Sequence, residues 1–247
     1  MKILAIPIAN LQSSELLTKI QQHWQKPQPL ALVGVNPEYL LATQVKPEVQ
    51  KFLEKSLNFA DGIGLIWAVN FQQKPNYCPK IIWLLLTLGA LLGPKKWLMR
   101  RGNLKHLCAT DFWPKLLTLA EKLQIRVTIL TPTQIPKAPY QPATPAAITK
   151  ALHQSWPQLK FGFGINPDAN LVLDARGMTK ATEKITQGVY APVGGFFDYL
   201  TGHIPRAPHC FRILGLEWLW RAFANQRFNR IWHATFGFIQ AIWRDSN

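Results

Sequence analysis

Short apolar runs and longer amphipathic stretches alternate along the first quarter of the chain. The short runs are rich in β-branched residues and are bounded by turn residues, which predicts two strands, Lys2–Ile8 and Leu30–Val35. Between them, a helix capped by Ser13 or Ser14 is predicted to run to about Trp24. A second helix is predicted over about 47–57. This order predicts an α/β fold with a parallel, doubly wound sheet that has helices on both faces.

The second half of the chain continues this alternation and then becomes helical. Its predicted strands and helices are, in chain order, Leu116–Leu123 (helix), Arg126–Leu130 (strand), Ile148–Ser155 (helix), Leu171–Leu173 (strand) and Val189–Val193 (strand). Prolines recur over 132–145 and exclude a helix or a central strand there. From about His209 to Arg244 the pattern predicts helices with a break near 225–229. We therefore expect an α/β domain over 1–208 and a helical appendage over 209–247.

The segment 81–93, IIWLLLTLGALLG, is apolar throughout. It is too short to span a bilayer as a helix, which needs roughly 20 residues. No acidic residue lies between Asp61 and Asp111, and the flanking cations are Lys80, Lys95, Lys96, Arg100, Arg101 and Lys105. An apolar run beside cations is typical of the membrane interface, so 81–105 is predicted to lie at a membrane. A buried core helix with a basic, solvated exit is the alternative.

The charge balance is strongly basic, with 28 Lys and Arg against 13 Asp and Glu and a net charge of +15. It predicts an anionic partner: nucleic acid, anionic lipid or a phosphorylated substrate. The appendage combines tryptophan with arginine, which suits lipid headgroups, single-stranded nucleic acid or a helix docked on its own core. Because no nucleic-acid motif is recognisable, we expect no nucleic-acid partner.

The cysteines and the N-terminus both indicate a cytoplasmic protein. Cys78, Cys108 and Cys210 are too few and too far apart for a disulfide framework or a zinc site. The first residues include a short apolar run but no small-residue cleavage site, so we interpret them as a strand and not as a signal peptide. A reducing, cytoplasmic compartment is the resulting expectation.

The first candidate motif is Asp61-Gly62-Ile63-Gly64, at a point where the chain passes from one element to another. Its two glycines permit backbone conformations and a close ligand approach that side chains would block. The carboxylate of Asp61 could serve as a general base. An Asx turn or a helix cap is the structural alternative for the same residue.

Three further candidates lie between residues 193 and 221. A strand leads into Gly194-Gly195, an arrangement that brings backbone N–H groups against a phosphate. Arg206 lies between two prolines, where its guanidinium can hold a carboxylate or a phosphate; a structural tie to Asp198 is the alternative. Glu217 and Arg221 are four residues apart on one predicted helix, which is also the spacing of an ordinary surface pair.

Taken together, these motifs resemble the WecG/TagA/CpsF family, glycosyltransferase family 26. The family's early "ADG-G" turn reads ADGIG at 60–64, and its late motif reads VGGFFDYLTGHIPRAPHCFRILGLEWLWR at 193–221. Asn36 is similar to the family's strand-end asparagine before a helix, and 109–112 is similar to its Gly-Ser/Thr-Asp turn. The resemblance implies a Rossmann-like α/β domain with a C-terminal appendage that meets the membrane and helps to close the active site.

The resemblance also implies a reaction. Family members transfer an N-acetylmannosamine-type hexose from a UDP-sugar, with inversion, to N-acetylglucosamine on a polyprenyl diphosphate such as undecaprenyl diphosphate. The products enter teichoic acid, enterobacterial common antigen or capsule synthesis. No tightly held metal and no cofactor beyond the UDP-sugar substrate are implied. The expected location is the cytoplasmic face of the bacterial inner membrane, as a peripheral protein.

Individual roles follow from motif position. The family's proposed base corresponds to Asp61. The residues expected to bind substrate are Asn36, Gly62, Gly64, Asp111, Lys180, Gly194, Gly195, Asp198, Arg206, Glu217 and Arg221. The two arginines are expected to support the departing diphosphate, with the Gly194-Gly195 amides as further donors. Asn36 and Asp111 are expected to orient sugar hydroxyls.

Two segments depart from the family pattern. Leu130–Thr133 stands where the family has a Gly-Gly turn, and 176–183 stands where it has Gly-x-Pro-Lys-Gln-Glu, of which Lys180 is retained. Both segments belong to the nucleotide-sugar side. The alternative function is therefore a catalytically degenerate, membrane-bound member that acts as a scaffold or regulator. A homo-oligomer would compete with the membrane for the same apolar surface.

Overall fold

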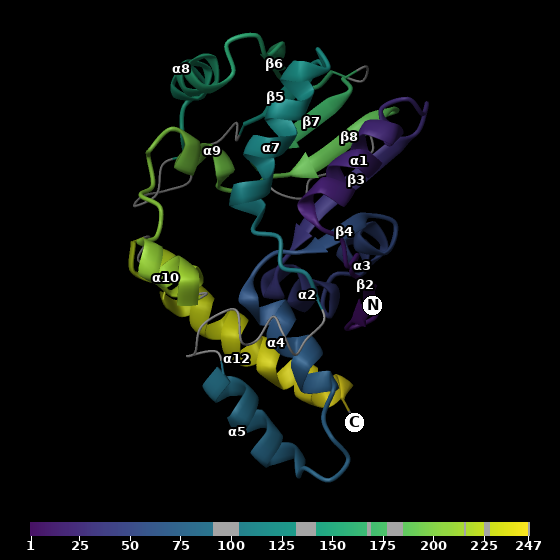
Figure 1. The fold of residues 1–247 in the computed structure, drawn as a ribbon, viewed down its shortest axis with the longest axis vertical. Coiled ribbons are helices and arrows are strands. Elements are labelled where there is room, and N and C mark those ends of the chain that lie inside the picture. Colours follow the sequence, from purple (N-terminus) through teal and green to yellow (C-terminus); the bar gives the residue numbers. More distant parts are fainter. Residues whose placement is uncertain are drawn as a thin grey trace. The chain divides into compact units, whose positions relative to one another are not determined.

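The computed structural model describes residues 1–90, 104–131, 142–166, 169–176, 185–214, 216–224 and 228–246 (Figure 1). The chain divides into two compact units. The first unit comprises residues 1–10, 35–108 and 207–247, and the second comprises 11–34 and 109–206. The C-terminal residues, expected as an appendage from residue 209, thus belong to the same unit as 35–108.

A parallel sheet of six strands confirms the predicted α/β class, and its order is β4-β3-β8-β7-β5-β6. The strands are β3 (Pro29–Val35), β4 (Leu57–Ala60), β5 (Val127–Leu130), β6 (Phe161–Phe163), β7 (Leu171–Asp174) and β8 (Gly188–Pro192). Within the second unit, Leu171 of β7 is in register with Val127 on one side and with Val189 on the other. The strands β5, β7 and β8 are buried along their whole length, as expected for strands covered on both faces.

In the described residues of the second unit, the helices are α1 (Ser13–His23), α7 (Ala109–Lys122), α8 (Pro145–Ser155) and α9 (Phe196–Leu200). The predicted serine cap of α1 is wrong. Gln12 is the N-cap residue, and its backbone N–H donates to the carboxylate of Glu15. Helix α8 begins earlier than predicted, because Pro145 occupies its first turn and the Thr144 hydroxyl accepts the N–H of Ala147.

The predicted single strand over 2–8 is wrong, because the chain reverses within it. Its two halves, β1 (Lys2–Ile3) and β2 (Ile6–Pro7), pair antiparallel in a separate two-stranded sheet. Leu4 and Ala5 form the turn with φ of 47° and 68°, a region that residues with side chains seldom adopt. The chain then contacts β4 through a parallel bridge between Ala9 and Phe59.

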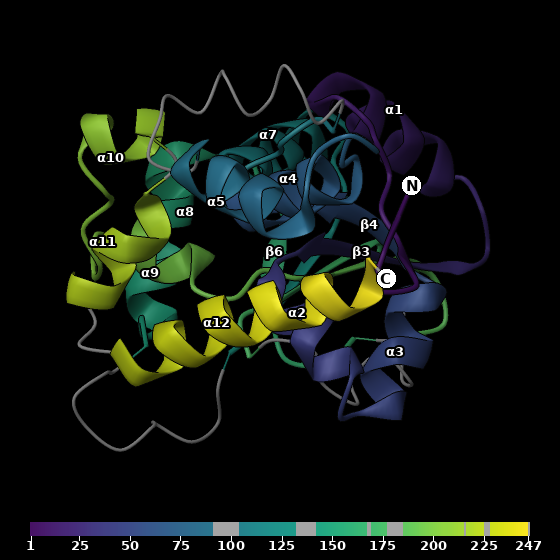
Figure 2. The ribbon, with the colours of Figure 1, turned by 90° about the horizontal axis from the view of Figure 1, so that it is seen from below.

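Seven of the helices in the described ranges belong to the first unit. They are α2 (Pro37–Thr43), α3 (Pro47–Glu54), α4 (Ile63–Gln72), α5 (Lys80–Ala90), α10 (His209–Leu214), α11 (Glu217–Ala224) and α12 (Phe228–Asp245). The C-terminal helix α12 packs against α2 and α4 (Figure 2). Its Phe238 and Ile242 are buried, and the Phe238 ring meets Trp67 edge-on at 6.2 Å between centroids. The predicted C-terminal helices are therefore present, and α12 helps to build the first unit's core.

The apolar segment that follows α4 forms α5, and its side chains are not buried as in a core helix. Ile81, Ile82, Leu85 and Leu86 are all exposed, so the alternative of a buried core helix is wrong for the described part of this segment. The rest of it, 91–103, with Lys95, Lys96, Arg100 and Arg101, lies outside the described residues. Over the described ranges, each helix falls short of the length and apolarity that crossing a membrane requires.

Candidate active site

In the first unit, the chain turns sharply between β4 and α4, and half-buried Asp61 lies in this turn. Its backbone N–H donates to the carbonyl oxygen of Val35, at the end of β3, over 2.8 Å. Gly62 has φ of 103°, so the prediction that this turn needs glycine is confirmed. The Gly62 N–H donates to Nε2 of His106 over 3.1 Å. Because Nε2 accepts, the neutral imidazole carries its proton on Nδ1.

The second glycine of the motif has a packing role. A Cβ added at Gly64 would lie 2.7 Å from Cγ of Pro37, so the missing side chain lets α4 approach the start of α2. The Asn36 side chain caps α2 by accepting the N–H of Tyr39 over 3.0 Å, which is the strand-end position before a helix that the sequence predicted. The structure therefore places Asn36, Gly62 and Gly64 at helix starts beside the Asp61 turn.

Residues 104–108 connect this turn to the C-terminal helices of the same unit. The backbone N–H of Leu107 donates to the carbonyl of Ala60 over 3.1 Å, next to Asp61. The Cys108 thiol lies 3.9 Å from Oε2 of Glu217, the first residue of α11. His106 and Cys108 were not predicted as site residues. No local pattern marks them, because His106 reaches the turn from 44 positions away in sequence.

In the second unit, Asp111 and Arg206 form an ion pair. Asp111 lies in the first turn of α7, and its Oδ1 accepts from Nη2 of Arg206 over 2.6 Å. The pair is open to solvent, with 57% of the Asp111 side chain and 32% of the Arg206 side chain exposed. The sequence offered Asp198 as an alternative partner of Arg206. In the structure Asp198 is buried and accepts the backbone N–H of Ala143 over 2.8 Å.

The glycine pair after β8 forms the predicted turn. Gly194 has φ of 52° and lets β8 turn directly into α9, and Gly195 is the N-cap residue of that helix. A Cβ at Gly195 would lie 3.3 Å from Oδ2 of Asp198, so this position is also packed. The turn is built partly by Asp198, whose backbone N–H donates to the Gly195 carbonyl over 3.2 Å.

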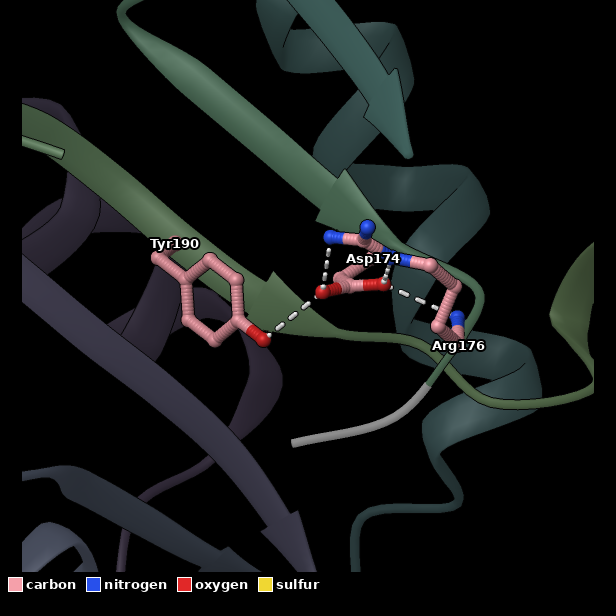
Figure 3. Close-up of polar contacts among 3 residues, drawn as sticks. All are labelled: Asp174, Arg176 and Tyr190. Atoms are coloured by element: carbon pink, nitrogen blue, oxygen red, sulfur yellow. Dashed lines mark hydrogen bonds and ion pairs between the residues drawn. The ribbon is translucent and has the colours of Figure 1, made fainter. Parts of the chain in front are cut away.

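A buried charged cluster that the sequence did not predict lies at the end of β7 (Figure 3). Asp174 is fully buried. It accepts from the Arg176 side chain through Nε over 3.0 Å and Nη2 over 3.1 Å, and from the Tyr190 hydroxyl over 3.0 Å. The hydrogen bond to Asp174 raises the pKa of Arg176, against the opposing effect of burial, so the guanidinium stays charged. This cluster fixes the chain where the altered segment 176–183 begins.

Two predicted site residues fall outside these contacts. Lys180 lies outside the described residues, and nothing is described of the Arg221 side chain, although its backbone is part of α11. Cys78, Cys108 and Cys210, which all lie in the described ranges, are not joined in disulfides. Across the described ranges, His, Cys, Asp and Glu side chains form no group of three that could hold a metal ion.

The fold and motifs together define an α/β enzyme class. Strands of a parallel sheet end in glycine turns, at Gly62 with the half-buried carboxylate of Asp61 beside it and at Gly194-Gly195, as in enzymes that handle phosphorylated ligands. The family model for the WecG/TagA/CpsF glycosyl transferases matches residues 1–247, and the chain belongs to this family. The resemblance drawn from the sequence motifs is thereby confirmed. The family consists of glycosyltransferases of cell-envelope polysaccharide synthesis, which use a nucleotide-sugar donor and a lipid-linked acceptor.

Proposed function

We propose that this protein transfers an N-acetylmannosamine-type sugar from a UDP-sugar to polyprenyl-diphosphate-linked N-acetylglucosamine, with inversion and with Asp61 as the general base. The Asp61 carboxylate takes the proton of the attacking acceptor hydroxyl. The hydroxyl oxygen then bonds to the anomeric carbon, and the bond to UDP breaks with its electron pair leaving on the diphosphate. The observation that carries the proposal is the position of Asp61, directly after a parallel strand in a turn that requires glycine at φ of 103°.

The departing UDP needs positive charge or N–H donors where its negative charge develops. We assign this role to Arg206 and Arg221, with the Gly194-Gly195 amides as further donors. The exposed Asp111–Arg206 pair supports the assignment, because solvent-exposed pairs of this kind contribute only about 0–1 kcal/mol and a diphosphate can displace the carboxylate. The released Asp111 and Asn36 would orient sugar hydroxyls, and Lys180, Asp198 and Glu217 would support the two substrates.

A lipid-linked acceptor requires the enzyme to work at a membrane. We place the protein peripherally on the cytoplasmic face of the inner membrane, held by its net charge of +15 and by exposed apolar side chains of the first unit. Teichoic acid, enterobacterial common antigen and capsule remain the three candidate polymers.

The second candidate function is a non-catalytic scaffold or regulator with the same fold. The observation that favours it is the altered donor-side segment, whose first residue, Arg176, is bound to the buried Asp174. Calorimetry with UDP and UDP-N-acetylhexosamines separates the two functions. Micromolar binding favours the enzyme, and no binding by the folded protein favours the scaffold.

The decisive test is transfer of labelled sugar from a panel of UDP-N-acetylhexosamines to a short-chain polyprenyl-diphosphate N-acetylglucosamine. Asp61→Asn should lower the transfer rate by roughly 10²–10⁴-fold, since it removes the proton acceptor. Asp245→Asn makes the same chemical change at an exposed residue near the end of α12 and should leave the rate unchanged. Normal turnover by Asp61→Asn would show that another group is the base.

A further inference from the structure

Helix α5 exposes apolar side chains to solvent, whereas a helix on the surface of a soluble protein exposes mainly polar ones. Its outward-facing residues are Ile81, Ile82, Leu85 and Leu86, with exposed fractions of 56%, 48%, 64% and 58%. They lie at positions i, i+1, i+4 and i+5, which form one continuous face. A contiguous exposed apolar face of this kind marks an interaction surface.

The opposite side of α5 is fastened to the first unit by polar groups. The Thr87 hydroxyl accepts from the Trp67 indole over 3.2 Å, and the Trp83 indole donates to the carbonyl of Phe71 over 3.1 Å. Because residue 67 bonds to 87 and 71 to 83, α5 runs antiparallel to α4. These bonds orient the helix, so its apolar side faces outward as part of the fold.

The start of α5 is fastened to α12. Nζ of Lys80 donates to the carbonyl of Trp243 over 2.6 Å and lies 4.5 Å above the centre of its ring. Lys80 thus places a cationic side chain at the start of the apolar face. Tyr77, just before the helix, is 90% exposed. An aromatic ring and a cation at the edge of an apolar face are the groups that a lipid headgroup region accommodates.

The charge around α5 selects the occupant of this face. No acidic residue occurs in the sequence between Asp61 and Asp111, whereas the cations Lys74, Lys80 and Lys105 of this stretch lie in the described part of the first unit. Within the described residues, Asp245 accepts from Gln72 at the end of α4 and brings a carboxylate near the start of α5, but cations still predominate there. An anionic lipid surface would therefore be attracted more than a second copy of this basic surface.

We propose that α5 is an in-plane membrane anchor, whose four exposed aliphatic side chains enter the interface of a bilayer that contains anionic phospholipid. At about 1.5 Å per residue the helix is about 16 Å long, so it lies along the surface and does not cross it. An isolated interfacial helix keeps a polar face toward water, whereas the corresponding side of α5 packs against the rest of the first unit. The inference rests on the proposed function in one respect: a lipid-linked acceptor requires the enzyme to work at a membrane.

The anchor is coupled to the Asp61 turn by a rigid element. Helix α4 begins at Ile63, directly after this turn, and is buried along most of its length. Since α5 runs back along α4, the end of α5 points toward the start of α4. The anchor therefore sets the height of Asp61 above the bilayer, where the diphosphate of a polyprenyl acceptor lies.

Vesicle flotation of the full-length protein tests the anchor without donor or acceptor. Wild-type protein should bind vesicles of phosphatidylcholine with phosphatidylglycerol, and more weakly those of phosphatidylcholine alone. The double variant Leu85→Glu, Leu86→Glu should bind the anionic vesicles at least about tenfold more weakly, because two of the four inserting side chains become charged. The matched control Val45→Glu, Leu123→Glu adds the same charges at exposed apolar positions outside α5 and should change binding by less than about twofold.

Circular dichroism must show all variants folded, and Leu85→Ala, Leu86→Ala, which adds no charge, should fall between wild type and the charged variant. Unchanged vesicle binding by the charged variant would overturn the anchor. A wild-type oligomer that dissociates in this variant, with vesicle binding unchanged, would assign the face to a second copy. Transfer to a water-soluble acceptor should survive in the charged variant. If the wild-type protein transferred no sugar but still bound vesicles through α5, the proposed reaction would be refuted and the anchor would stand.

Discussion

The buried cluster at the end of β7 gives the sharpest stability prediction. Asp174 is fully buried and accepts four hydrogen bonds: from the Arg176 backbone N–H at 2.9 Å, its Nε at 3.0 Å and Nη2 at 3.1 Å, and the Tyr190 hydroxyl at 3.0 Å. Asp174→Asn removes the negative charge and replaces one accepting oxygen by an NH₂ donor. If the NH₂ group takes the place of Oδ1, it faces the backbone N–H and Nε of Arg176. If it takes the place of Oδ2, it faces Nη2 of Arg176 and the Tyr190 hydroxyl.

Breaking a buried ion pair at one partner costs about 3–5 kcal/mol. The Arg176 side chain is 24% exposed, so water replaces part of the lost interaction and the lower end, about 3 kcal/mol, is expected. For a chain of 247 residues this corresponds to a melting temperature lower by about 6–12 °C. Tyr190→Phe removes only one hydrogen bond to the charged group and should cost about 1.5 kcal/mol.

Urea unfolding followed by circular dichroism measures both free energies, and thermal melts check them. The reasoning requires Asp174→Asn to be clearly worse than Tyr190→Phe. If Asp174→Asn lost less than about 1 kcal/mol, or no more than Tyr190→Phe, the cluster would be solvated and would not fix the end of β7.

The remaining predictions concern the first unit. Gly64→Ala places a Cβ 2.7 Å from Cγ of Pro37 and should destabilise by about 1–3 kcal/mol in urea unfolding. Gly89→Ala in α5, where no atom lies within 4 Å, should instead stabilise by about 0.5–1 kcal/mol, and equal effects of the two would contradict the packing role of Gly64. His106→Ala removes the acceptor of the Gly62 N–H, so transfer should fall by about 10–100-fold through displacement of Asp61. His106→Gln keeps an acceptor and should recover part of this loss in the same assay, whereas equal rates for both variants would exclude a positioning role.

The strands show which part of a fold periodicity can predict. Runs such as VTIL and LVL contain β-branched residues, are mostly apolar and are bounded by turns, so β5 and β7 were predicted within one residue. β4 was missed because LNFA contains Asn58, whose buried amide bonds to the carbonyls of Pro7 and Leu53, a tertiary arrangement with no local signal. β6 was missed because the short FGF lies at the sheet edge with its phenylalanine at 163 exposed.

In the candidate site too, features set by the local sequence were predictable and tertiary contacts were not. The glycine requirement after Asp61 was predictable, since a carboxylate before Gly-x-Gly marks a turn with special backbone angles. The reason for Gly64 was not, because its neighbour is the ring of Pro37 and that contact exists only once α2 and α4 pack. Likewise, the sequence offered Asp198 as the alternative partner of Arg206, whereas the fold also brings it Asp111, 95 positions away.

Arg176 and Arg206, both in the second unit, differ in how deeply their carboxylate partners are buried. The Arg176 partner is fully buried and is shared with Tyr190, so withdrawing the guanidinium would leave an uncompensated buried carboxylate, at a cost of several kcal/mol. The Arg206 partner is 57% exposed, and water can solvate Asp111 as soon as the pair opens. A phosphate that competes for Arg176 must overcome the first cost, whereas the Asp111 pair that it would displace at Arg206 is open to solvent. We therefore propose Arg206, and not Arg176, as the cation that binds the diphosphate, while Arg176 keeps the end of β7 in place.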